Sequence, residues 1–479
     1  MLEAPRVLDS APVPDLDAYR ASGGGKGLEA ARRLGAAGTI VEVAASGLRG
    51  RGGAGFPTGR KWRTVAGYES PEVPAVVAVN AAEGEPGSFK DRAIIRANPY
   101  RVIEGALIAA HAVAADRVVI ATKASFRHEI ERLESAVKEV VAAGWAEGVD
   151  VSVLGGPSEY LYGEETALLE VLDGREPFPR VSPPWRRGVD EVPIEPGTEI
   201  ERGAADVELV TPESDFPVAP ALVDNVETIA NVAGILANGA DWFRELGTPE
   251  SPGSVVCTIS GRTARAGVAE VPLGTTLADV IERVGGGARP GRKLVGAVSG
   301  VANAVIPAAQ FDTPLTYEAM QAIGSGLGAA GFIVFDDETD LVAVAHAIAR
   351  FLAVESCGQC TPCKQDGLAI SEALGRVRSS EAKEDDLDTV ERRLGTVTFG
   401  ARCTLAQQQQ TVVGSVLSLF PDAFRAHATG EVPGAEPELI AEILDIVDGV
   451  ARLDARHQAK QPDWTYDAVD SGQAPADRL

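Results

Sequence analysis

The chain has 479 residues, of which 45% are hydrophobic and 24% charged. That length predicts two to four domains, and the composition excludes disorder as the main state. The 44 Lys and Arg against 69 Asp and Glu give a net charge of −25, so the surface would repel the phosphates of nucleic acids and of anionic lipids. We therefore expect no nucleic-acid partner, and any phosphate site must be built locally from backbone N–H groups and a few cations.

Two further absences concern the membrane. The sequence contains no apolar run of about 18 residues, the length that a membrane-spanning helix needs. Its first residues lack a basic segment followed by an apolar core, which is the pattern of a secretory signal. We expect a cytoplasmic protein without direct membrane insertion, and peripheral attachment to a membrane complex stays open.

The first half of the chain alternates apolar runs with helical patterns. Buried strands are predicted at 75–79, 118–121 and 151–154, and helices at 101–114 and 130–143. This alternation predicts an α/β domain with a parallel sheet over residues 1–245. The Pro-rich stretch 177–220 within it is predicted to be a long irregular loop.

The second half changes texture twice. Short strand patterns around one helical segment predict a small β-grasp-like domain over residues 250–335. Apolar residues at helical spacing then predict a helical domain over residues 338–435. For residues 436–479 we expect a C-terminal helix followed by a flexible polar tail.

Four of the five cysteines form one pattern. Cys357, Cys360 and Cys363 have the spacing Cys-x-x-Cys-x-x-Cys, and Cys403 follows 40 residues later. Three thiolates at this spacing and a fourth from a distant segment can ligate a [4Fe–4S] cluster. Tetrahedral zinc is the main alternative, and a set of buried structural thiols is the weaker one. Cys257 lies in an apolar strand pattern and is predicted to be a buried structural thiol.

A glycine-rich stretch, Ser46–Trp62, carries the strongest nucleotide signal. Its glycines allow the backbone to approach a ligand closely, and their N–H groups can surround a phosphate. The stretch also supplies cations and one aromatic ring that could stack on a base or a flavin. The candidate binding residues here are Gly50, Arg51, Gly52, Gly53, Ala54, Gly55, Phe56 and Lys61. An ordinary Gly-rich surface loop is the alternative.

Two more loops follow predicted strands. Asn80, Glu83 and Glu85 come after the first strand, and Tyr160, Gly163, Glu164 and Glu165 come after the third. Loops at the carboxyl ends of parallel strands are where α/β sheets bind ligands. Asn80 could bond a ring carbonyl or imide, and Glu83 could accept from ribose hydroxyls. Each residue taken alone could equally be part of an acidic turn.

Taken together, these motifs resemble the NADH-binding flavoprotein (51-kDa, F-type) subunit of respiratory complex I. That family includes diaphorase subunits of NAD-linked hydrogenases and formate dehydrogenases. The resemblance covers roughly residues 15–430 and is most specific in Glu355–Cys363 and in the glycine-rich stretch. It implies an α/β FMN/NADH domain, a β-grasp domain of the SLBB (soluble-ligand-binding) type and a helical bundle with one [4Fe–4S] cluster.

The resemblance also implies roles for single residues. The glycine-rich stretch would bind FMN and the NADH phosphates, with Phe56 on the adenine side and Lys61 near the FMN phosphate. Asn80 and the Gly163–Glu165 segment would line the flavin, and Glu83 would lie near NADH. Asn225 and Thr228 would bind the FMN phosphate. Cys357, Cys360, Cys363 and Cys403 would ligate the cluster.

The sequence departs from the family pattern in three places. Ala82 stands where the family has an Asp that contacts the flavin, and Asp224 stands where it has an Asn. The stretch 184–224 is longer than the family's connection. An acid beside a phosphate would repel it unless the carboxylate points away.

The resulting prediction is an NADH:acceptor oxidoreductase subunit that uses FMN, NADH and one [4Fe–4S] cluster. No side-chain acid or base is required for hydride transfer, so no catalytic residue is assigned. The expected partners are a thioredoxin-like [2Fe–2S] subunit and a larger redox complex. Two alternatives remain: an electron-relay subunit that keeps the cluster but has lost NADH oxidation, and a ferredoxin-linked flavoprotein that reduces NAD.

Overall fold

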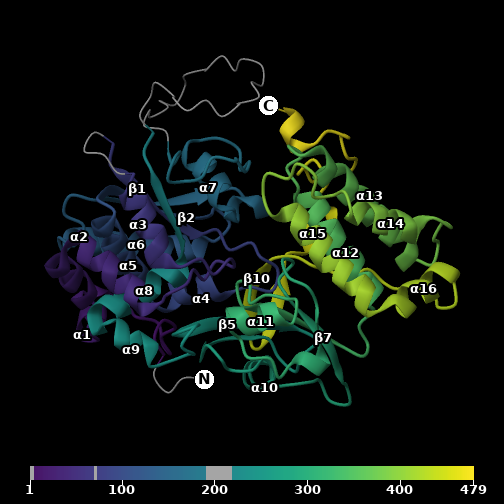
Figure 1. Cartoon of the computed structure of the whole chain (residues 1–479), viewed down its shortest axis with the longest axis horizontal. Coiled ribbons are helices and arrows are strands. Elements are labelled where there is room, and N and C mark those ends of the chain that lie inside the picture. Colours follow the sequence, from purple (N-terminus) through teal and green to yellow (C-terminus); the bar gives the residue numbers. More distant parts are fainter. Residues whose placement is uncertain (1–4, 69–72, 190–217, 479) are drawn as a thin grey trace.

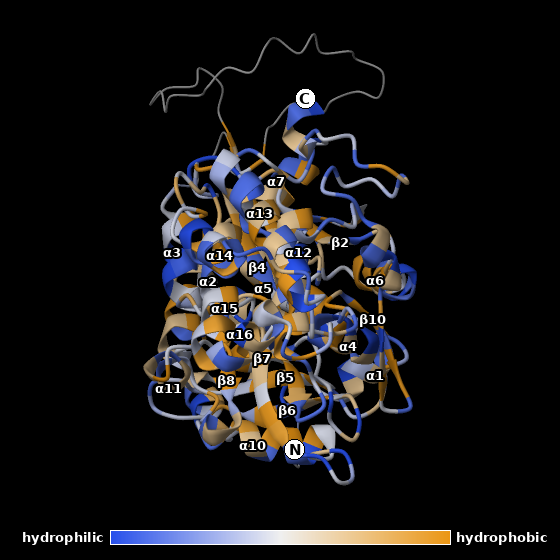
Figure 2. Cartoon of the chain, turned by 90° about the vertical axis from the view of Figure 1, so that its right-hand side faces the viewer, coloured by the Kyte–Doolittle hydropathy of each residue, from blue (hydrophilic) through white to orange (hydrophobic). Residues whose placement is uncertain are grey.

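The computed structural model describes residues 5–68, 73–189 and 218–478. Three domains pack against one another in it (Figure 1): an α/β domain, a smaller sheet domain below it and a helical domain to its right. Apolar residues gather on the strands and on the inner faces of the helices (Figure 2). Within the described ranges, no helix is both long and apolar enough to cross a bilayer.

The α/β domain is built on a four-stranded sheet in which every strand pair is parallel. Its strands are β1 (Ala75–Ala81), β2 (Ala115–Lys123), β3 (Asp150–Gly156) and β4 (Ala221–Asn225), in the order β3-β2-β1-β4. The helices are α1 (Leu16–Ala21), α2 (Lys26–Ser46), α3 (Thr58–Ala66), α4 (Lys90–Ala97), α5 (Pro99–Ala112), α6 (Arg127–Ala142), α7 (Glu165–Leu172), α8 (Val226–Asn238) and α9 (Ala240–Arg244), with a 3-10 turn at Tyr160–Gly163. The predicted parallel sheet is confirmed.

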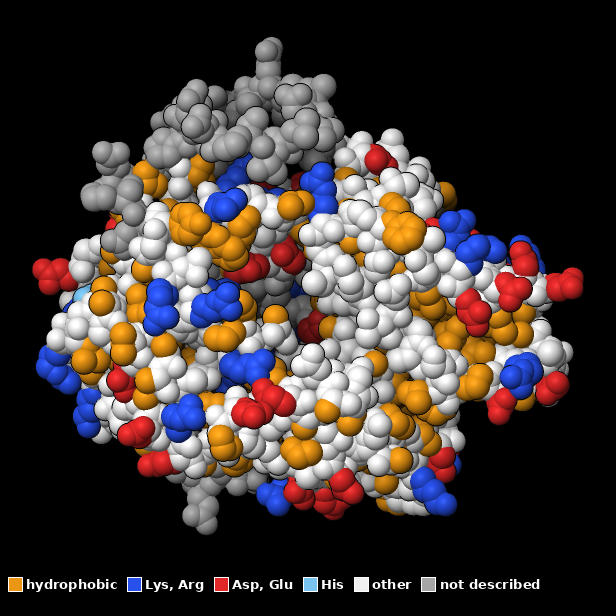
Figure 3. All heavy atoms as spheres, in the orientation of Figure 1, with side chains coloured by type: hydrophobic (Ala, Val, Ile, Leu, Met, Phe, Trp, Pro, Cys, Tyr) orange, Lys and Arg blue, Asp and Glu red, His pale blue; other side chains and the backbone are white. Residues whose placement is uncertain are grey.

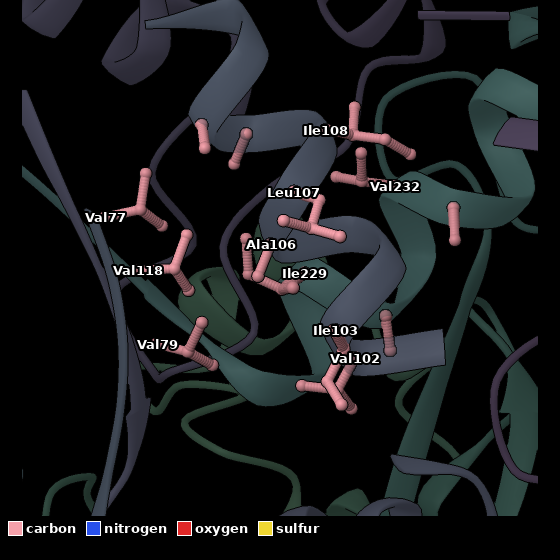
Figure 4. Close-up of a cluster of buried hydrophobic side chains, with 14 of the residues drawn as sticks. Val77, Val79, Val102, Ile103, Ala106, Leu107, Ile108, Val118, Ile229 and Val232 are labelled. Atoms are coloured by element: carbon pink, nitrogen blue, oxygen red, sulfur yellow. The ribbon is translucent and has the colours of Figure 1, made fainter. Parts of the chain in front are cut away.

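The core of this domain lies between the sheet and two of its helices. Val77 and Val79 of β1 face Leu107 of α5 and Ile229 of α8 (Figure 4), and all four are buried. Gly105 allows the two helices to cross closely, because a Cβ there would lie 2.1 Å from the Ile229 carbonyl oxygen. This packing fixes the position of α8, which follows β4 directly in the chain. The N-terminus of α8 helps to form the site described below.

The second domain is a five-stranded mixed sheet, as expected for a β-grasp domain. It contains β5 (Ser254–Gly261), β6 (Gly267–Pro272), β7 (Leu294–Ser299), β8 (Ile306–Pro307) and β9 (Gly331–Asp336), in the order β6-β5-β9-β7-β8. Helix α10 (Leu277–Gly285) packs against β5, and α11 (Tyr317–Ala322) lies near the glycine-rich stretch. Only β5 and β9 run parallel among its pairs in the described residues.

The third domain is a helical bundle, also as predicted. It consists of α12 (Leu341–Glu355), α13 (Thr361–Arg378), α14 (Asp386–Leu394), α15 (Leu405–Leu419) and α16 (Pro421–Thr429). The bundle core includes Ile348, Leu352, Ile370 and Leu374, which are all fully buried. The loop between α12 and α13 carries Cys357 and Cys360, and Cys363 lies in the first turn of α13.

The end of the chain differs from the expectation of a helix followed by a flexible tail. Strands β10 (Ile443–Val447) and β11 (Val450–Leu453) form a hairpin, and 3-10 turns follow at Ala455–Ala459 and Pro475–Arg478. The hairpin turns at Asp448 and Gly449, which both have positive φ, the conformation that the tightest hairpin turns require. The polar segment after it is packed, since His457, Lys460 and Asp463 are buried.

Candidate functional site

The strand order reverses between β1 and β4, and we call the region outside the carboxyl ends of these two strands the crevice. The chain runs outward from β1 through β2 to β3, and β4 then pairs with the other side of β1. Asn80 and Asn225 are register partners at the carboxyl ends of these two strands. In open α/β sheets, ligands bind in the crevice outside the strand ends where the order reverses in this way.

The glycine-rich stretch forms a closed loop beside this crevice, between α2 and α3. Arg49 pairs with Pro57 in an antiparallel bridge, and Gly50 donates its N–H to the Phe56 carbonyl at 2.8 Å. Gly53 pairs with Gly328 of the β-grasp domain in a second antiparallel bridge. Within the described residues, the N–H group of Gly52 has no hydrogen-bond acceptor. A free backbone donor in a glycine-rich loop is suited to binding a phosphate.

The ring of Phe56 projects from the same loop and is 44% exposed. The guanidinium of Arg60 lies 5.6 Å from the centre of that ring. An exposed aromatic face supported by a cation is available for stacking on a base. The structure therefore leaves Phe56 free for the role that the family resemblance implies.

Arg51 does not point into the crevice, although the sequence analysis counted it among the binding residues. Its side chain is buried, and its guanidinium donates to the Arg49 carbonyl at 2.9 Å, the Ser254 carbonyl at 2.9 Å and the Tyr317 hydroxyl at 3.1 Å. Its backbone N–H donates to Thr228 Oγ1 at 2.8 Å. Arg51 thus fixes the glycine-rich loop to α8 and to the β-grasp domain.

Lys61 lies at the end of β4, inside the crevice. Its Nζ is 2.7 Å from Glu165, 2.7 Å from the Val223 carbonyl and 3.8 Å from Asp224. Burial alone would lower the pKa of Lys61, but Asp224 and Glu165 raise it above its ordinary value. The cation is therefore charged at neutral pH, and a phosphate would have to compete with these partners for it.

Asp224, one of the departures from the family pattern, is also paired. Its carboxylate accepts from Trp62 Nε1 at 2.7 Å and faces Lys61. Burial raises the pKa of Asp224, and Lys61 and Trp62 oppose that shift. Because this acid is turned to a cation and an indole N–H, it does not present an unpaired negative charge to a ligand.

Asn225 and Thr228 lie at the start of α8 but already have protein partners. Asn225 caps the helix by accepting from the Glu227 N–H at 3.0 Å, accepts from Lys90 Nζ at 2.8 Å and donates to Asp91 at 2.7 Å. Thr228 accepts from Arg51. Lys90 is a site residue that the sequence did not indicate. Burial alone would lower the pKa of its ammonium, but the carboxylates of Asp91 and Glu227 raise it above its ordinary value.

Asn80 and Gly163, two of the candidate flavin-lining residues, are in contact. Asn80 Nδ2 donates to the Gly163 carbonyl at 2.8 Å, so the loops after β1 and β3 form one wall of the crevice. Glu164 caps α7 by accepting from the N–H groups of Thr166 and Ala167. Ala82 is buried in a small apolar cluster that includes Tyr162.

Glu83 is directed into the protein rather than toward the opening. Its carboxylate accepts from Ser88 Oγ at 2.6 Å, from the Asp91 N–H at 3.1 Å and from Arg92 Nε at 3.0 Å. Burial alone would raise the pKa of Glu83, but the nearby cations Arg92 and Lys90 outweigh burial and lower it below its ordinary value. The group is therefore ionised. This carboxylate caps the start of α4 and is not placed to accept from a ribose.

Glu85 and Tyr160 join the three domains. The Tyr160 hydroxyl donates to Glu85 at 2.5 Å and lies 3.3 Å from Gln408 on α15, and the Val301 N–H of the β-grasp domain donates to Glu85 at 2.7 Å. Burial raises the pKa of Glu85. Figure 3 shows a hollow on this side of the molecule, between the α/β and helical domains, with acidic side chains inside it.

All four predicted cluster cysteines line one cavity, together with Leu161 and Pro179. Three of their sulfurs have a polar neighbour: Cys357 takes Gln359 Nε2 at 3.5 Å, Cys360 takes the Arg402 N–H at 3.4 Å, and Cys363 lies 3.4 Å from Ser356 Oγ. Such donors stabilise thiolates bound to iron. Cys257 lies elsewhere, fully buried in the β-grasp core.

The cavity also bears on the zinc alternative. Across the described ranges, no three His, Cys, Asp or Glu side chains are grouped as they would be around a single metal ion. Burial raises the pKa of Cys363 to about 11 and that of Cys403 to about 12, so both are thiols until a metal displaces their protons. Four cysteines spread around one cavity fit a multi-iron cluster better than one zinc ion.

Three family models match the chain in the order of its domains. The Nuo51 FMN-binding domain matches residues 43–234, the SLBB domain residues 256–302, and the NADH-ubiquinone oxidoreductase-F iron-sulfur binding region residues 343–427. The matches confirm FMN and the iron–sulfur cluster as the cofactors and the SLBB-type domain between their sites.

Relatives and solved structures agree. An F-type subunit of the NADH-quinone oxidoreductase of Rhizobium meliloti (strain 1021) is 34% identical over 439 residues, which cover 88% of this chain and 97% of the relative. The HndC subunit of the NADP-reducing hydrogenase of Solidesulfovibrio fructosivorans is 31% identical, over 86% and 80%. A chain of the NAD+-reducing [NiFe]-hydrogenase in its H2-reduced state superposes with a TM-score of 0.73 at 31% identity, over 87% of this chain and 67% of that one. The chain therefore belongs to the family of F-type subunits of NADH-quinone oxidoreductases, the flavoprotein family that the sequence resembles.

Proposed function

We propose that this chain oxidises NADH at the crevice between β1 and β4 and passes the electrons through its four-cysteine site to a partner protein. The observation that carries the proposal is the presence of both sites in one chain, on either side of Tyr160. Tyr160 lies in the loop that follows β3 of the α/β domain. The Tyr160 hydroxyl lies 3.3 Å from Gln408, which comes five residues after Cys403. FMN, when bound, takes two electrons as a hydride and gives them up one at a time, which suits a one-electron cluster.

The residues of the crevice would act by binding and orientation. The free N–H group of Gly52 and the ammonium of Lys61 would hold phosphate. Asn80 is fixed by Gly163 and would orient the flavin ring, and Phe56 would stack on the adenine side of the nucleotide. Asn225 and Thr228 would act indirectly, because they hold α8 and the glycine-rich loop in place.

NADH would be preferred over NADPH at this site. Glu164 caps the start of α7 at the wall of the crevice, and its negative charge would oppose a 2′-phosphate. Glu165 contributes less, because it is paired with Lys61 at 2.7 Å. Glu83 drops out of this argument because it is bound to Arg92. The stretch from residue 190 to residue 217 lies outside the described residues.

We further propose that the chain works as one component of a larger redox complex. Its relatives are named as subunits of an NADH-quinone oxidoreductase and of a hydrogenase. A thioredoxin-like [2Fe–2S] subunit is the proposed neighbour, and attachment to the membrane would be peripheral and through the complex. The arrangement of two redox sites in series supports an electron exit on the side of the cysteines.

Anaerobic titration of the purified holoprotein with NADH tests the function. We expect the flavin absorbance to bleach with one equivalent of NADH, and the cluster to give a reduced-state EPR signal afterwards. A protein that contains the cluster but no NADH-reducible flavin would refute the proposal and support the relay alternative. Ala82 and Asp224 are the two departures that motivate that alternative, and the pairing of Asp224 with Lys61 and Trp62 supports FMN binding despite the acid.

A further inference from the structure

The last part of the chain, residues 436–478, contacts all three domains, and we name it the C-terminal strap. It lies beyond the residues that the three family models match. On the α/β domain, Arg92 donates to the Ile443 carbonyl and Arg96 pairs with Asp445 at 2.7 Å. On the β-grasp domain, the Ala266 N–H donates to the Gly449 carbonyl at 2.6 Å.

The strap then packs directly on the loop that carries the cysteines. The Ala476 N–H donates to the carbonyl oxygen of Cys357 at 2.9 Å. Gly358 has a φ of +88°, and a Cβ there would lie 2.2 Å from the Cβ of Ala474. The buried ammonium of Lys364 donates to the Ser356 carbonyl at 2.9 Å and to the Pro462 carbonyl at 2.5 Å. The loop around Cys357 is therefore held from outside by the strap.

Glu355 links the strap to both redox sites. It ends α12, two residues before Cys357, and is 2% exposed. One carboxylate oxygen accepts the backbone N–H of Tyr160 at 3.0 Å, and the other accepts Lys460 Nζ at 2.7 Å and His457 Nε2 at 3.0 Å. A buried carboxylate needs such partners, because an unpaired charge in the protein interior is strongly destabilising.

The positions of Lys460 and His457 are themselves well defined. Lys460 is 3% exposed, and the His457 ring stacks on Phe351 of α12 with ring centres 4.7 Å apart. Arg350, one turn before the end of α12, donates to the carbonyls of His457 and Lys460, each at 3.0 Å. The strap thus delivers a positive charge to one defined point between the two sites.

We propose that the C-terminal strap sets the position of the cysteine loop relative to the flavin-side loop, and that Lys460 is its main positioning residue. Lys460 holds Glu355, and Glu355 in turn holds the backbone of Tyr160 at the crevice and the start of the cysteine loop. The strap therefore governs electron passage from the flavin site to the cluster. This inference rests on the proposed function, since it assigns the strap a role between the two redox sites.

The test compares three full-length variants with the wild type. Lys460→Met removes the charge with little change of side-chain length, and Lys460→Arg keeps the charge. Arg456→Met is the matched control, because this cation of the same segment pairs with Asp454 on the surface and its side chain is 67% exposed. For each protein we would measure the FMN content, the rate of flavin bleaching by NADH, the rate of cluster reduction by rapid-freeze EPR, and the EPR line shape after reduction with dithionite.

In Lys460→Met we expect normal FMN content and flavin bleaching, cluster reduction slowed by about 10- to 100-fold, and an altered EPR line shape. Lys460→Arg should recover most of the rate, and Arg456→Met should match the wild type. The inference is overturned if Lys460→Met equals the wild type, if Lys460→Arg is no better than Lys460→Met, if Arg456→Met has the same defect, or if Lys460→Met loses flavin together with the cluster. If NADH bleaches no flavin even in the wild type, the proposed function fails, while the line shapes after dithionite still test the strap.

Discussion

The closed glycine-rich loop allows its glycines to be tested against one another. Gly55 has a φ of +62°, and a Cβ added there would lie 2.3 Å from the ring of Tyr317. Gly50 lies in the same loop without a positive φ, and a Cβ there would meet nothing closer than 3.6 Å. We expect Gly55→Ala to disturb the loop strongly and Gly50→Ala to be nearly neutral.

The size of the effect follows from two terms. Alanine in the left-handed region costs about 1–2 kcal/mol. The displaced Tyr317 hydroxyl would lose its bonds to the Gly50 carbonyl and to Arg51, which are worth about 0.5–1.5 kcal/mol each. The sum is roughly 2–5 kcal/mol. If the free energy of FMN binding falls by only the lower value, about 2 kcal/mol, the Kd for FMN rises about 30-fold, since about 1.4 kcal/mol is a factor of ten.

Fluorescence titration of the flavin-depleted chain with FMN would measure these constants. Gly53→Ala separates the two terms, because Gly53 has a φ of +127° but open space where the Cβ would lie, so this variant carries backbone strain alone. The expected order of Kd is wild type and Gly50→Ala lowest, then Gly53→Ala, then Gly55→Ala. Equal Kd values for Gly50→Ala and Gly55→Ala would refute the reasoning, because the loop would then not keep this shape around FMN.

Three further predictions concern the other sites. Cys403→Ser should lose or convert the [4Fe–4S] cluster while Cys257→Ser keeps it, and equal iron and sulfide in wild type and Cys403→Ser would contradict the ligand set. Lys61→Ala should weaken FMN binding by about 10- to 150-fold, the worth of a charge-assisted hydrogen bond of about 1.5–3 kcal/mol, and full flavin content after dialysis would show that this ammonium does not face the phosphate. Burial lowers the pKa of His346 to about 4; the unfolded chain therefore binds this proton more readily, and the stability that the neutral ring contributes is present above about pH 6.5 and is lost as pH falls toward 4. His346→Gln should flatten that part of the acid sensitivity in urea unfolding, and an unchanged slope between about pH 7 and pH 5 would count against the assignment.

The fold was largely predictable because its signals are local. The apolar run 75–79 lies within β1, and the cysteine spacing alone indicated the cluster site. The hairpin at the end of the chain was missed although Asp448-Gly449 is a strong turn signal. The two strands of the hairpin do not alternate regularly between apolar and polar residues, so they give no clear strand pattern. They are held in place by contacts with residues far away in the chain, such as Arg92.

Two candidate side chains at the site, Arg51 and Glu83, make contacts that the sequence does not indicate. Arg51 is a candidate as a cation among the glycines, and Glu83 as an acceptor for ribose hydroxyls in the loop after a predicted strand. Burial of Arg51 depends on the β-grasp domain, which begins about two hundred residues later in the chain, and Glu83 is turned inward by the first turn of α4. No local pattern reports such contacts, whereas the side chains that do reach the crevice, Lys61 and Asn80, follow from their places at element ends.

The pairing of β1 with β4 has a consequence for how the two cofactor sites come into being. Val76 pairs with Ala221, so one wall of the flavin crevice joins strands separated by most of the α/β domain. Contacts of such long sequence separation form slowly, because a large loop must close first. The cysteines lie within the 47 residues from Cys357 to Cys403, all in the helical domain. During biosynthesis, iron could therefore be inserted into a locally folded bundle, whereas flavin must await closure of the whole sheet.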